Sequence, residues 1–399
     1  MHHAAALKLS ALAFAASLTF SFLLFPALRE EQHLNVDPDR FGALALNIAQ
    51  GHGFAYDPGG APVVERAPLY GYLLAGLFRV GGYSLAAVQI LQAIFHAATS
   101  FMLFLLALRL WDRPTALLAQ TIFALHPVAL WYTARIWTET TFTLLIASLA
   151  LVLFIFFESP SFKRSVIAGF LLGLSCLTKP VMLLFPVALL PLLTIRFKMA
   201  GVKNGMLLLL TTLLTILPWT MRNYFVTQSV VPVNTSLGFN LVQGDAIGEA
   251  WPWGGAGTLE YWNIAGRRVD SVLASVNGRW QSVEGDRKLV RVSLAGWSAS
   301  FVARRFLANF CTFWYLSESG MKSAVIGCLQ GIVLLLSFLS YRRLHRTARN
   351  ALSPIVALLV YYVFATSMVV GWGRYSAPIV PLLVLLASPI IERWRRSSP

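Results

Sequence analysis

Acidic and basic side chains gather between residues 35 and 70, in a chain of which 12% of the residues are charged and 57% are hydrophobic. A charged group near lipid hydrocarbon costs about 2.5–3.5 kcal/mol on insertion scales, so such groups are usually functional. This stretch is therefore predicted to form a reaction site at a membrane face. Its charged candidates are Asp37, Asp39, Asp57, Glu65 and Arg66.

Two of these acids, Asp37 and Asp39, flank Pro38, and the proline is expected to hold its neighbours extended. One carboxylate of such a pair can act as a general base toward an acceptor hydroxyl. Two together can hold a divalent cation, so a metal is neither required nor excluded by the sequence. The alternative is a solvated acidic loop, since short acidic pairs are common on protein surfaces.

Cations form the other half of the predicted site. The forked guanidinium of Arg66, next to Glu65, suits a phosphate, although an anchor at the membrane interface is the alternative. Four more cations lie at the expected outer ends of transmembrane helices. The positive-inside rule, which places basic residues on the cytoplasmic side, does not account for cations there. Around one cavity they would bind a lipid phosphate or diphosphate, whereas each alone can be an interfacial side chain. They are Arg135, Lys179, Arg222 and Arg374.

Glu139 opens an apolar segment at the same outer face. A carboxylate there needs a partner, and Arg135 lies four residues earlier. A structural ion pair and a catalytic role both stay open for Glu139. No nucleotide-binding loop, serine-nucleophile elbow or HExxH metal motif accompanies these residues, so nucleotide-driven chemistry is not supported.

The fold that must position these residues is an all-α polytopic membrane protein. The mean hydropathy of +0.66 is too high for a soluble chain. Apolar runs of about 17–25 residues can cross a bilayer as helices. We expect about ten transmembrane helices in one domain over residues 1–399, with both termini cytoplasmic. Their approximate ranges are 7–28, 85–108, 114–132, 138–157, 165–178, 180–196, 204–221, 323–341, 352–371 and 376–392.

The net charge of +15 is explained by topology. Basic clusters alternate along the chain with acid-rich segments, which is the positive-inside pattern of a multi-pass membrane protein and places the clusters in the cytoplasm. We therefore predict membrane lipids, not nucleic acid, as the surroundings of the basic clusters. The clusters lie at residues 109–113, 163–164, 196–203, 342–349 and 393–396.

Two segments, 29–84 and 222–322, are too polar to span and are expected outside. In the first, helical spacing predicts interfacial helices over 41–50, stopped by Gly51 and Gly53, and over 68–78. In the second, an amphipathic helix is expected over 286–314, and a flexible turn at Gly254, Gly255 and Gly257. The first segment is the predicted catalytic loop. The second segment is expected to form a lid over the molecules that react there.

The chain resembles bacterial members of the GT-C glycosyltransferase superfamily, in the branch that contains protein O-mannosyltransferases and the lipid A aminoarabinose transferase. Weak motifs in the family's order carry this resemblance over nearly the entire chain. They are DPDRFGALALNIAQGHGF, ERAPLYGYLLAGLFRVGG, TARIWTETTFTLL, GFLLGLSCLTKPVMLLFP, LPWTMRNYFVTQSVVPVNTSLGFNLVQGD and GWGRYSAPIVPLL.

The resemblance implies a sugar donor carried on polyprenyl phosphate and an inverting transfer in the cell envelope. It makes Asp37 the first-loop acid that acts as base or orients the acceptor, with Asp39 beside it. It places Glu65 and Arg66 near the donor phosphate, together with Lys179, Arg222 and Arg374. The Arg-Asn pair of the fifth motif adds Asn223 to the candidates.

The sequence departs from the protein-mannosylating members, because Pro38 separates acids that are adjacent in them, and a large lumenal domain between later spans is missing. The acceptor is therefore open among lipid, polysaccharide and protein. Two other classes stay open: a flippase or transporter for lipid-linked sugars, and a non-catalytic GT-C-like scaffold. Charges gathered at one face, without an internal repeat, favour the enzyme over a transporter.

Overall fold

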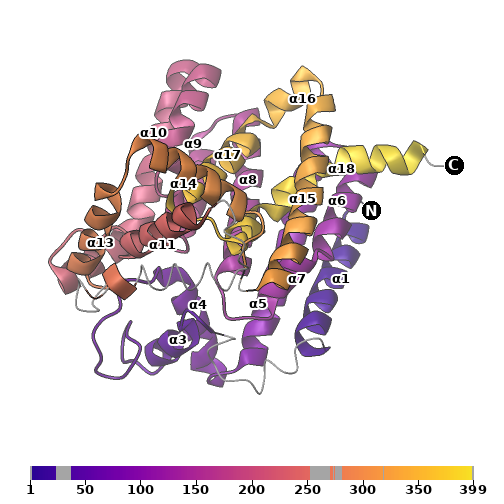
Figure 1. The fold of residues 1–399 in the computed structure, drawn as a ribbon. Helices are drawn as coiled ribbons and strands as arrows, with labels where there is room; N and C mark the ends of the chain where they lie inside the picture. Colours follow the sequence, from indigo (N-terminus) through magenta and orange to yellow (C-terminus); the bar gives the residue numbers. More distant parts are fainter. Residues whose placement is uncertain are drawn as a thin grey trace.

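The computed structural model describes residues 2–23, 37–251, 270–272, 274, 281–317 and 319–397. Every regular element among these residues is a helix, apart from an isolated bridge between Ala55 and Pro62. The all-α prediction is thereby confirmed, and the helices form a bundle with shorter helices at one end (Figure 1). The glycine turn predicted at 254–257 and the end of the first span, 24–28, lie outside the described residues.

Six of the described helices are long and apolar enough to cross a membrane, or seven if the bent pair α6–α7 counts as one span. The protein is thus a multi-pass membrane protein, but ten spans are not shown. The predicted spans 165–178 and 352–371 correspond to α9 and α17, which have only 15 and 17 residues. The spanning candidates and these two helices are α1 (His2–Leu23), α5 (Leu85–Leu110), α6 (Arg113–Ala124), α7 (Pro127–Thr133), α8 (Glu139–Glu158), α9 (Phe162–Cys176), η1 (Pro180–Met182) with α10 (Phe185–Thr227), α15 (Gly320–Arg343), α17 (Ser353–Val369), and η2 (Gly373–Ile379) with α18 (Val380–Ser397).

Helix α10 reverses its direction at Lys198, whose φ of 53° and ψ of −134° are not helical. A Cβ placed on Gly205 would lie 2.6 Å from Leu190 Cδ2. Fifteen residues of straight helix would separate these positions by about 22 Å. The two halves of α10 therefore run antiparallel and coincide with the predicted spans 180–196 and 204–221. The predicted spans 165–178 and 180–196 are separate helices, as expected: α9 ends at Cys176, and η1 follows before α10 begins.

The first of the two segments expected outside, 29–84, contains the two predicted helices, α3 (Phe41–Ala49) and α4 (Pro68–Gly81). After α3 the chain turns through Gly51 and Gly53, whose φ angles of 86° and 85° favour glycine. The apolar face of α3 packs on α4, where Phe41 and Leu44 join Tyr70 and Leu74 in one buried cluster. This contact fixes the loop that leads into α3.

In the second outer segment, α11 (Leu237–Ala250) is followed by two helices where we predicted one over 286–314. They are α13 (Val283–Ala295) and α14 (Ala299–Thr312). Gly296 ends α13, and the Ser298 hydroxyl accepts a hydrogen bond from the backbone N–H of Phe301, so that a new helix begins. A short helix, α16 (Arg346–Ala351), joins α15 to α17.

Helix α8 lies in the centre of the bundle, with Phe142, Ile146, Leu149 and Phe156 fully buried against neighbouring helices. The elements that pack on it include α5, α9, α17 and η2. Because Glu139 is its first residue, the packing of α8 brings that carboxylate next to the α9–α10 break and to η2. This junction positions the candidate site.

Candidate functional site

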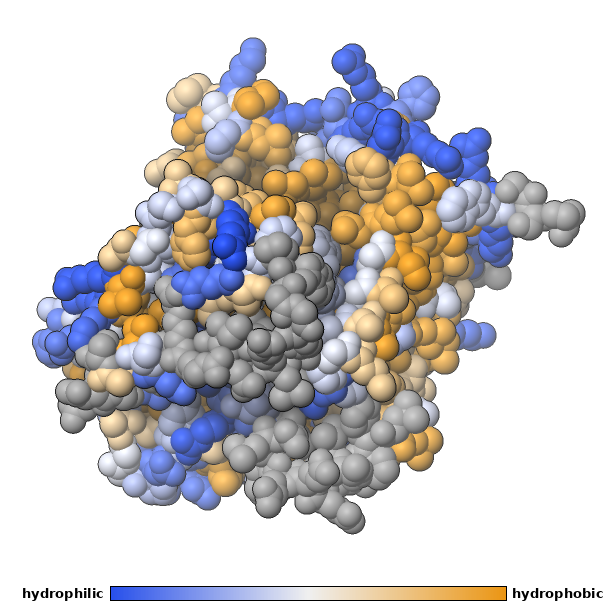
Figure 2. Space-filling view, viewed as in Figure 1, coloured by the Kyte–Doolittle hydropathy of each residue, from blue (hydrophilic) through white to orange (hydrophobic). Residues whose placement is uncertain are grey.

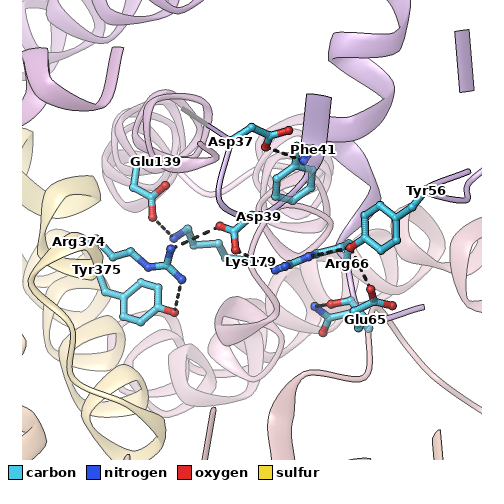
Figure 3. A network of polar contacts seen from close by, with 11 residues as sticks. Asp37, Asp39, Phe41, Tyr56, Glu65, Arg66, Glu139, Lys179, Arg374 and Tyr375 are labelled. Atoms are coloured by element: carbon cyan, nitrogen blue, oxygen red, sulfur yellow. Dashed lines mark hydrogen bonds and ion pairs between the residues drawn. The ribbon is translucent and has the colours of Figure 1, made fainter. Parts of the chain in front are cut away.

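Asp39 lies at the centre of a group of cations (Figure 3). One carboxylate oxygen is 3.1 Å from Nη1 of Arg66, and the other is 3.4 Å from Nη1 of Arg374. The three side chains are 22%, 26% and 30% exposed, so the group is open to a ligand. These contacts join the loop before α3, the start of α4 and η2, which are far apart in the sequence.

Lys179 belongs to the same group and forms an ion pair with Glu139 at 2.8 Å. The predicted partner of Glu139 was Arg135, and this prediction was wrong because the turn between α9 and η1 brings Lys179 over the start of α8. Lys179 Nζ also lies 4.7 Å from the ring centre of Tyr375. Glu139 is only 2% exposed, so its charge depends on this lysine.

Among the side chains that form these ion pairs, cations outnumber carboxylates. Three cations and two carboxylates, in Arg66, Lys179, Arg374, Asp39 and Glu139, leave one net positive charge. Burial acts to raise the pKa of Asp39, but the neighbouring Arg374, Arg66 and Lys179 hold it below the ordinary value of 3.8. Asp39 is therefore a permanent anion at neutral pH, and it orients the two guanidinium groups.

Asp37 lies beside this group with its carboxylate at the start of α3. Its two oxygens accept hydrogen bonds from the backbone N–H groups of Phe41, at 2.7 Å, and Gly42, at 2.6 Å. The expected extended conformation around Pro38 was wrong: the N–H of Arg40 donates to the carbonyl of Asp37, which closes a turn. Burial raises the pKa of Asp37 to about 6, although the backbone hydrogen bonds oppose the shift.

Glu65 and Arg66 are joined through a tyrosine that the sequence analysis did not select. The hydroxyl of Tyr56 donates to Glu65 at 2.9 Å and accepts from Nε of Arg66 at 3.3 Å. Tyr375, which accepts from Arg374 at 3.2 Å, was also missed. In the sequence, only the position next to Arg374 indicated that Tyr375 could belong to the site. No sequence pattern indicated Tyr56.

Arg135 lies at the edge of the group. Its guanidinium lies between the indole rings of Trp131 and Trp137, 4.8 and 4.9 Å from their centres. Arg374 lies 5.7 Å from the centre of the Trp137 ring. The two arginines therefore share one aromatic ring, and Arg135 adds positive potential at the edge of the group.

Arg222 and Asn223 lie elsewhere. Arg222 donates to the carbonyl of Val63 at 2.8 Å and stacks 4.6 Å from the ring centre of Trp219. The amide of Asn223 donates to the carbonyls of Val231 and Val233 at 3.1 and 3.0 Å. Within the described part of the chain, neither contacts the cations around Asp39. Both side chains fix loop carbonyls beside the end of α10.

A divalent cation is not supported by the described residues. Among them, no group of three or more His, Cys, Asp or Glu side chains is placed to hold a metal ion. Asp37 points to backbone N–H groups and Asp39 to two guanidinium groups, so the two carboxylates do not converge on a common point. The residues present do not fit the metal that the acidic pair suggested.

Replacement of Lys179 by Met should lower the free energy of unfolding by about 3–5 kcal/mol, because Glu139 would stay buried without its cation. The melting temperature in detergent measures this loss. As a control, Arg109→Met breaks an ion pair to Glu158 whose side chains are 48% and 47% exposed, and should cost at most about 1 kcal/mol. Equal losses in both variants would contradict the structural importance of the Lys179–Glu139 pair.

Residues 65–221 match the family described as dolichyl-phosphate-mannose-protein mannosyltransferase. The matched segment contains Glu65, Arg66, Glu139 and Lys179, whereas Asp37, Asp39 and Arg374 lie outside it. A search of the curated proteins finds no match.

Solved structures share the fold. The archaeal oligosaccharyltransferase AglB from Archaeoglobus fulgidus, in complex with an inhibitory peptide and a dolichol-phosphate, superposes with a TM-score of 0.61 at 14% identity, covering 98% of this chain and 51% of that one. The Archaeoglobus fulgidus oligosaccharyltransferase in complex with Zn and sulfate gives a TM-score of 0.53 at 15% identity, covering 97% of this chain and 50% of that one. ArnT from Cupriavidus metallidurans bound to undecaprenyl phosphate gives 0.45 at 14% identity, covering 96% and 76%, a likeness too weak to support an argument.

The helical bundle and its superposition on AglB define a multi-pass membrane protein that shares the fold of that oligosaccharyltransferase. Its residues 65–221, less than half of the chain, are similar to the dolichyl-phosphate-mannose-protein mannosyltransferase family, in agreement with the resemblance found in the sequence. The chain spans about half the length of the oligosaccharyltransferases that it matches.

Proposed function

We propose that this protein transfers a sugar from a polyprenyl-phosphate carrier to a hydroxyl group of a lipid, polysaccharide or protein acceptor. The reaction takes place at the outer face of a bacterial inner membrane, with both termini in the cytoplasm, and it inverts the anomeric centre. The observation that carries the proposal is the group of three cations around Asp39, which leaves one net positive charge. A glycosyl phosphodiester carries one negative charge and complements it.

The cations would act most strongly on the leaving group. When the bond between the anomeric carbon and the phosphate oxygen breaks, its electron pair passes to the phosphate, which gains a second negative charge. Arg66, Lys179 and Arg374 then stabilise a charge that is larger in the transition state than in the bound donor. Asp39 holds the two guanidinium groups in place before the donor arrives, so little reorganisation is needed.

Asp37 would be the general base. Its pKa of about 6 suits proton transfer near neutral pH, whereas the lowered pKa of Asp39 makes that residue a weaker base. Each oxygen of Asp37 accepts one backbone N–H and keeps a further lone pair for an acceptor hydroxyl. The acceptor oxygen loses its proton to Asp37 and attacks the anomeric carbon opposite the phosphate, which produces inversion.

The isoprenoid tail would lie in an apolar groove of about 400 Å³ between α14, α15, α17 and α18. Figure 2 shows hydrophobic side chains gathered on this face around α15. One lining residue, Ile379, is in η2 with Arg374, so the groove leads toward the cations. The other lining residues include Phe306, Phe310, Trp314, Leu334 and Phe338. The outer segment 222–322 would close over donor and acceptor.

The test is release of polyprenyl phosphate by purified protein supplied with labelled sugar-linked polyprenyl phosphates and mixed envelope acceptors. We expect wild type to release the carrier and Arg66→Ala to lose most of that release. The variant Arg109→Gln, whose exposed side chain pairs with Glu158, is the matched control and should keep full activity.

A second arm separates the enzyme from a flippase. In proteoliposomes, a flippase would move the labelled lipid between leaflets without breaking its glycosyl bond. Movement without carrier release would overturn the proposal, and so would the absence of both from folded protein with every donor.

A further inference from the structure

Arg305 of α14 and Asp245 of α11 form an ion pair inside the second outer segment. Arg305 Nε lies 2.6 Å from Asp245 Oδ1, and both side chains are only 1% exposed. Two further donors reach the carboxylate of Asp245: the hydroxyl of Ser293 at 2.5 Å and the indole N–H of Trp297 at 3.1 Å. Such a pair is costly to bury unless all its donors and acceptors are used.

Besides a hydrogen bond from Nη2 to the carbonyl of Leu241 in α11 at 3.2 Å, Arg305 donates to the end of another helix. Its Nη1 donates to the carbonyl of Met368 at 2.6 Å, and Nη2 to the carbonyl of Val369 at 2.7 Å. These are the last two residues of α17, whose terminal carbonyls have no partner within the helix. A guanidinium there satisfies them and complements the negative end of the helix dipole.

The contacts continue along the chain toward the candidate site. The N–H of Gly371 donates to Oδ1 of Asn309 at 2.7 Å, and the N–H of Gly373 to the carbonyl of Leu316 at 2.8 Å. A Cβ on Gly371 would overlap the backbone of Asn309, so the segment lies directly against α14. The backbone is thus held at several points from Met368 to Gly373, and the next residue is Arg374.

We propose that Arg305, charged and oriented by Asp245, is the positioning residue for Arg374. The outer helices α11 and α14 form a rigid support for the segment between α17 and η2, and this support fixes the guanidinium of Arg374 at Asp39. The inference rests on the proposed function and extends it. Arg305 and Asp245 do not contact the sugar donor, but they determine how tightly the protein binds it.

Arg304 provides a matched control from the same helix. It donates to the carbonyls of Glu249, at 2.6 Å, and Trp251, and therefore stabilises the end of α11 instead of α17. Substitution of either arginine should loosen the packing of the outer segment. Only substitution of Arg305 should also displace Arg374.

The experiment measures binding of farnesyl phosphate, a short isoprenyl phosphate, to the full chain in detergent by calorimetry. We expect Arg305→Lys to weaken binding about ten-fold, because a lysine cannot serve Asp245 and both carbonyls together. Arg304→Lys should change the affinity less than about two-fold, since its hydrogen bonds are exposed. In an Arg374→Ala background, Arg305→Lys should have no further effect.

Hydrogen exchange supplies a readout that does not depend on the ligand. A peptide covering residues 370–376 should exchange faster in Arg305→Lys than in wild type or Arg304→Lys, with helix α8 unchanged in all three. Farnesyl phosphate binding that is lost with Arg374→Ala but unchanged with Arg305→Lys overturns this inference alone. No binding by wild type overturns the proposed function and this inference with it.

Discussion

Replacement of Asp37 by Asn should lower the rate of sugar transfer by about 10²- to 10⁴-fold, the usual contribution of a general base. The amide has the size of the carboxylate but cannot take the acceptor proton. It keeps one oxygen for a backbone N–H of α3 and loses the other of the two hydrogen bonds, so the folded structure should persist. Steady-state release of polyprenyl phosphate measures the loss.

The raised pKa of Asp37 predicts how the rate of sugar transfer changes with pH. Below the Asp37 pKa of about 6 the carboxyl is protonated and cannot accept a proton, so kcat/KM should rise with pH through about 6 and then level off. The residual activity of Asp37→Asn should lack this rise.

Asp57→Asn is the control for Asp37→Asn, because Asp57 is an acid of the same loop with a side chain that is 77% exposed. It should leave both the rate and the pH profile unchanged. Full activity of Asp37→Asn, together with loss of activity in Asp39→Asn, would transfer the role of base to Asp39.

The sequence predicted which charged residues lie together better than it predicted how they pair. Cations at expected outer helix ends, which the positive-inside rule does not explain, indicated part of the group correctly. Lys179 and Arg374 do lie with Arg66 around Asp39. The same signal selected Arg222, which instead binds loop carbonyls. Charge placement along the chain cannot distinguish a ligand-binding cation from one that satisfies a nearby backbone, since both lie at the end of a helix.

Long-range partners were beyond sequence reasoning. Glu139 was paired with Arg135, four residues earlier in the chain, but the packing of α9 against α8 supplied a lysine 40 residues away. Arg305 looked like one charge on an interfacial helix, yet its partner Asp245 is 60 residues distant and the pair is buried. Helical periodicity identified α3, α4 and the spanning helices because it depends on residues three or four apart. It contains no information on which helix ends meet.

Removal of the cation at Arg374 should be nearly as damaging as removal of the base. Arg374→Ala should lower kcat/KM for a polyprenyl-phosphate sugar by about 10²- to 10³-fold, the effect of losing one donor to a developing charge. Arg374 contacts Asp39 and the hydroxyl of Tyr375, so its guanidinium is held in place before the donor binds. Without it, Asp39 keeps Arg66 as its one ion-pair partner among the described residues, and the group loses its net positive charge.

A comparison of Arg374→Ala with Arg222→Ala tests whether this effect comes from position or from charge alone. Both variants remove one arginine near the same end of the molecule, but Arg222 makes its hydrogen bonds to the carbonyls of Val63 and Phe54. Arg222→Ala should therefore change kcat/KM less than about ten-fold, mainly through a looser loop. Arg374→Lys should recover part of the rate, because a point charge replaces the fork. Equal losses in Arg222→Ala and Arg374→Ala would mean that the donor phosphate responds to the total charge of the outer face, and the site around Asp39 would lose its special role.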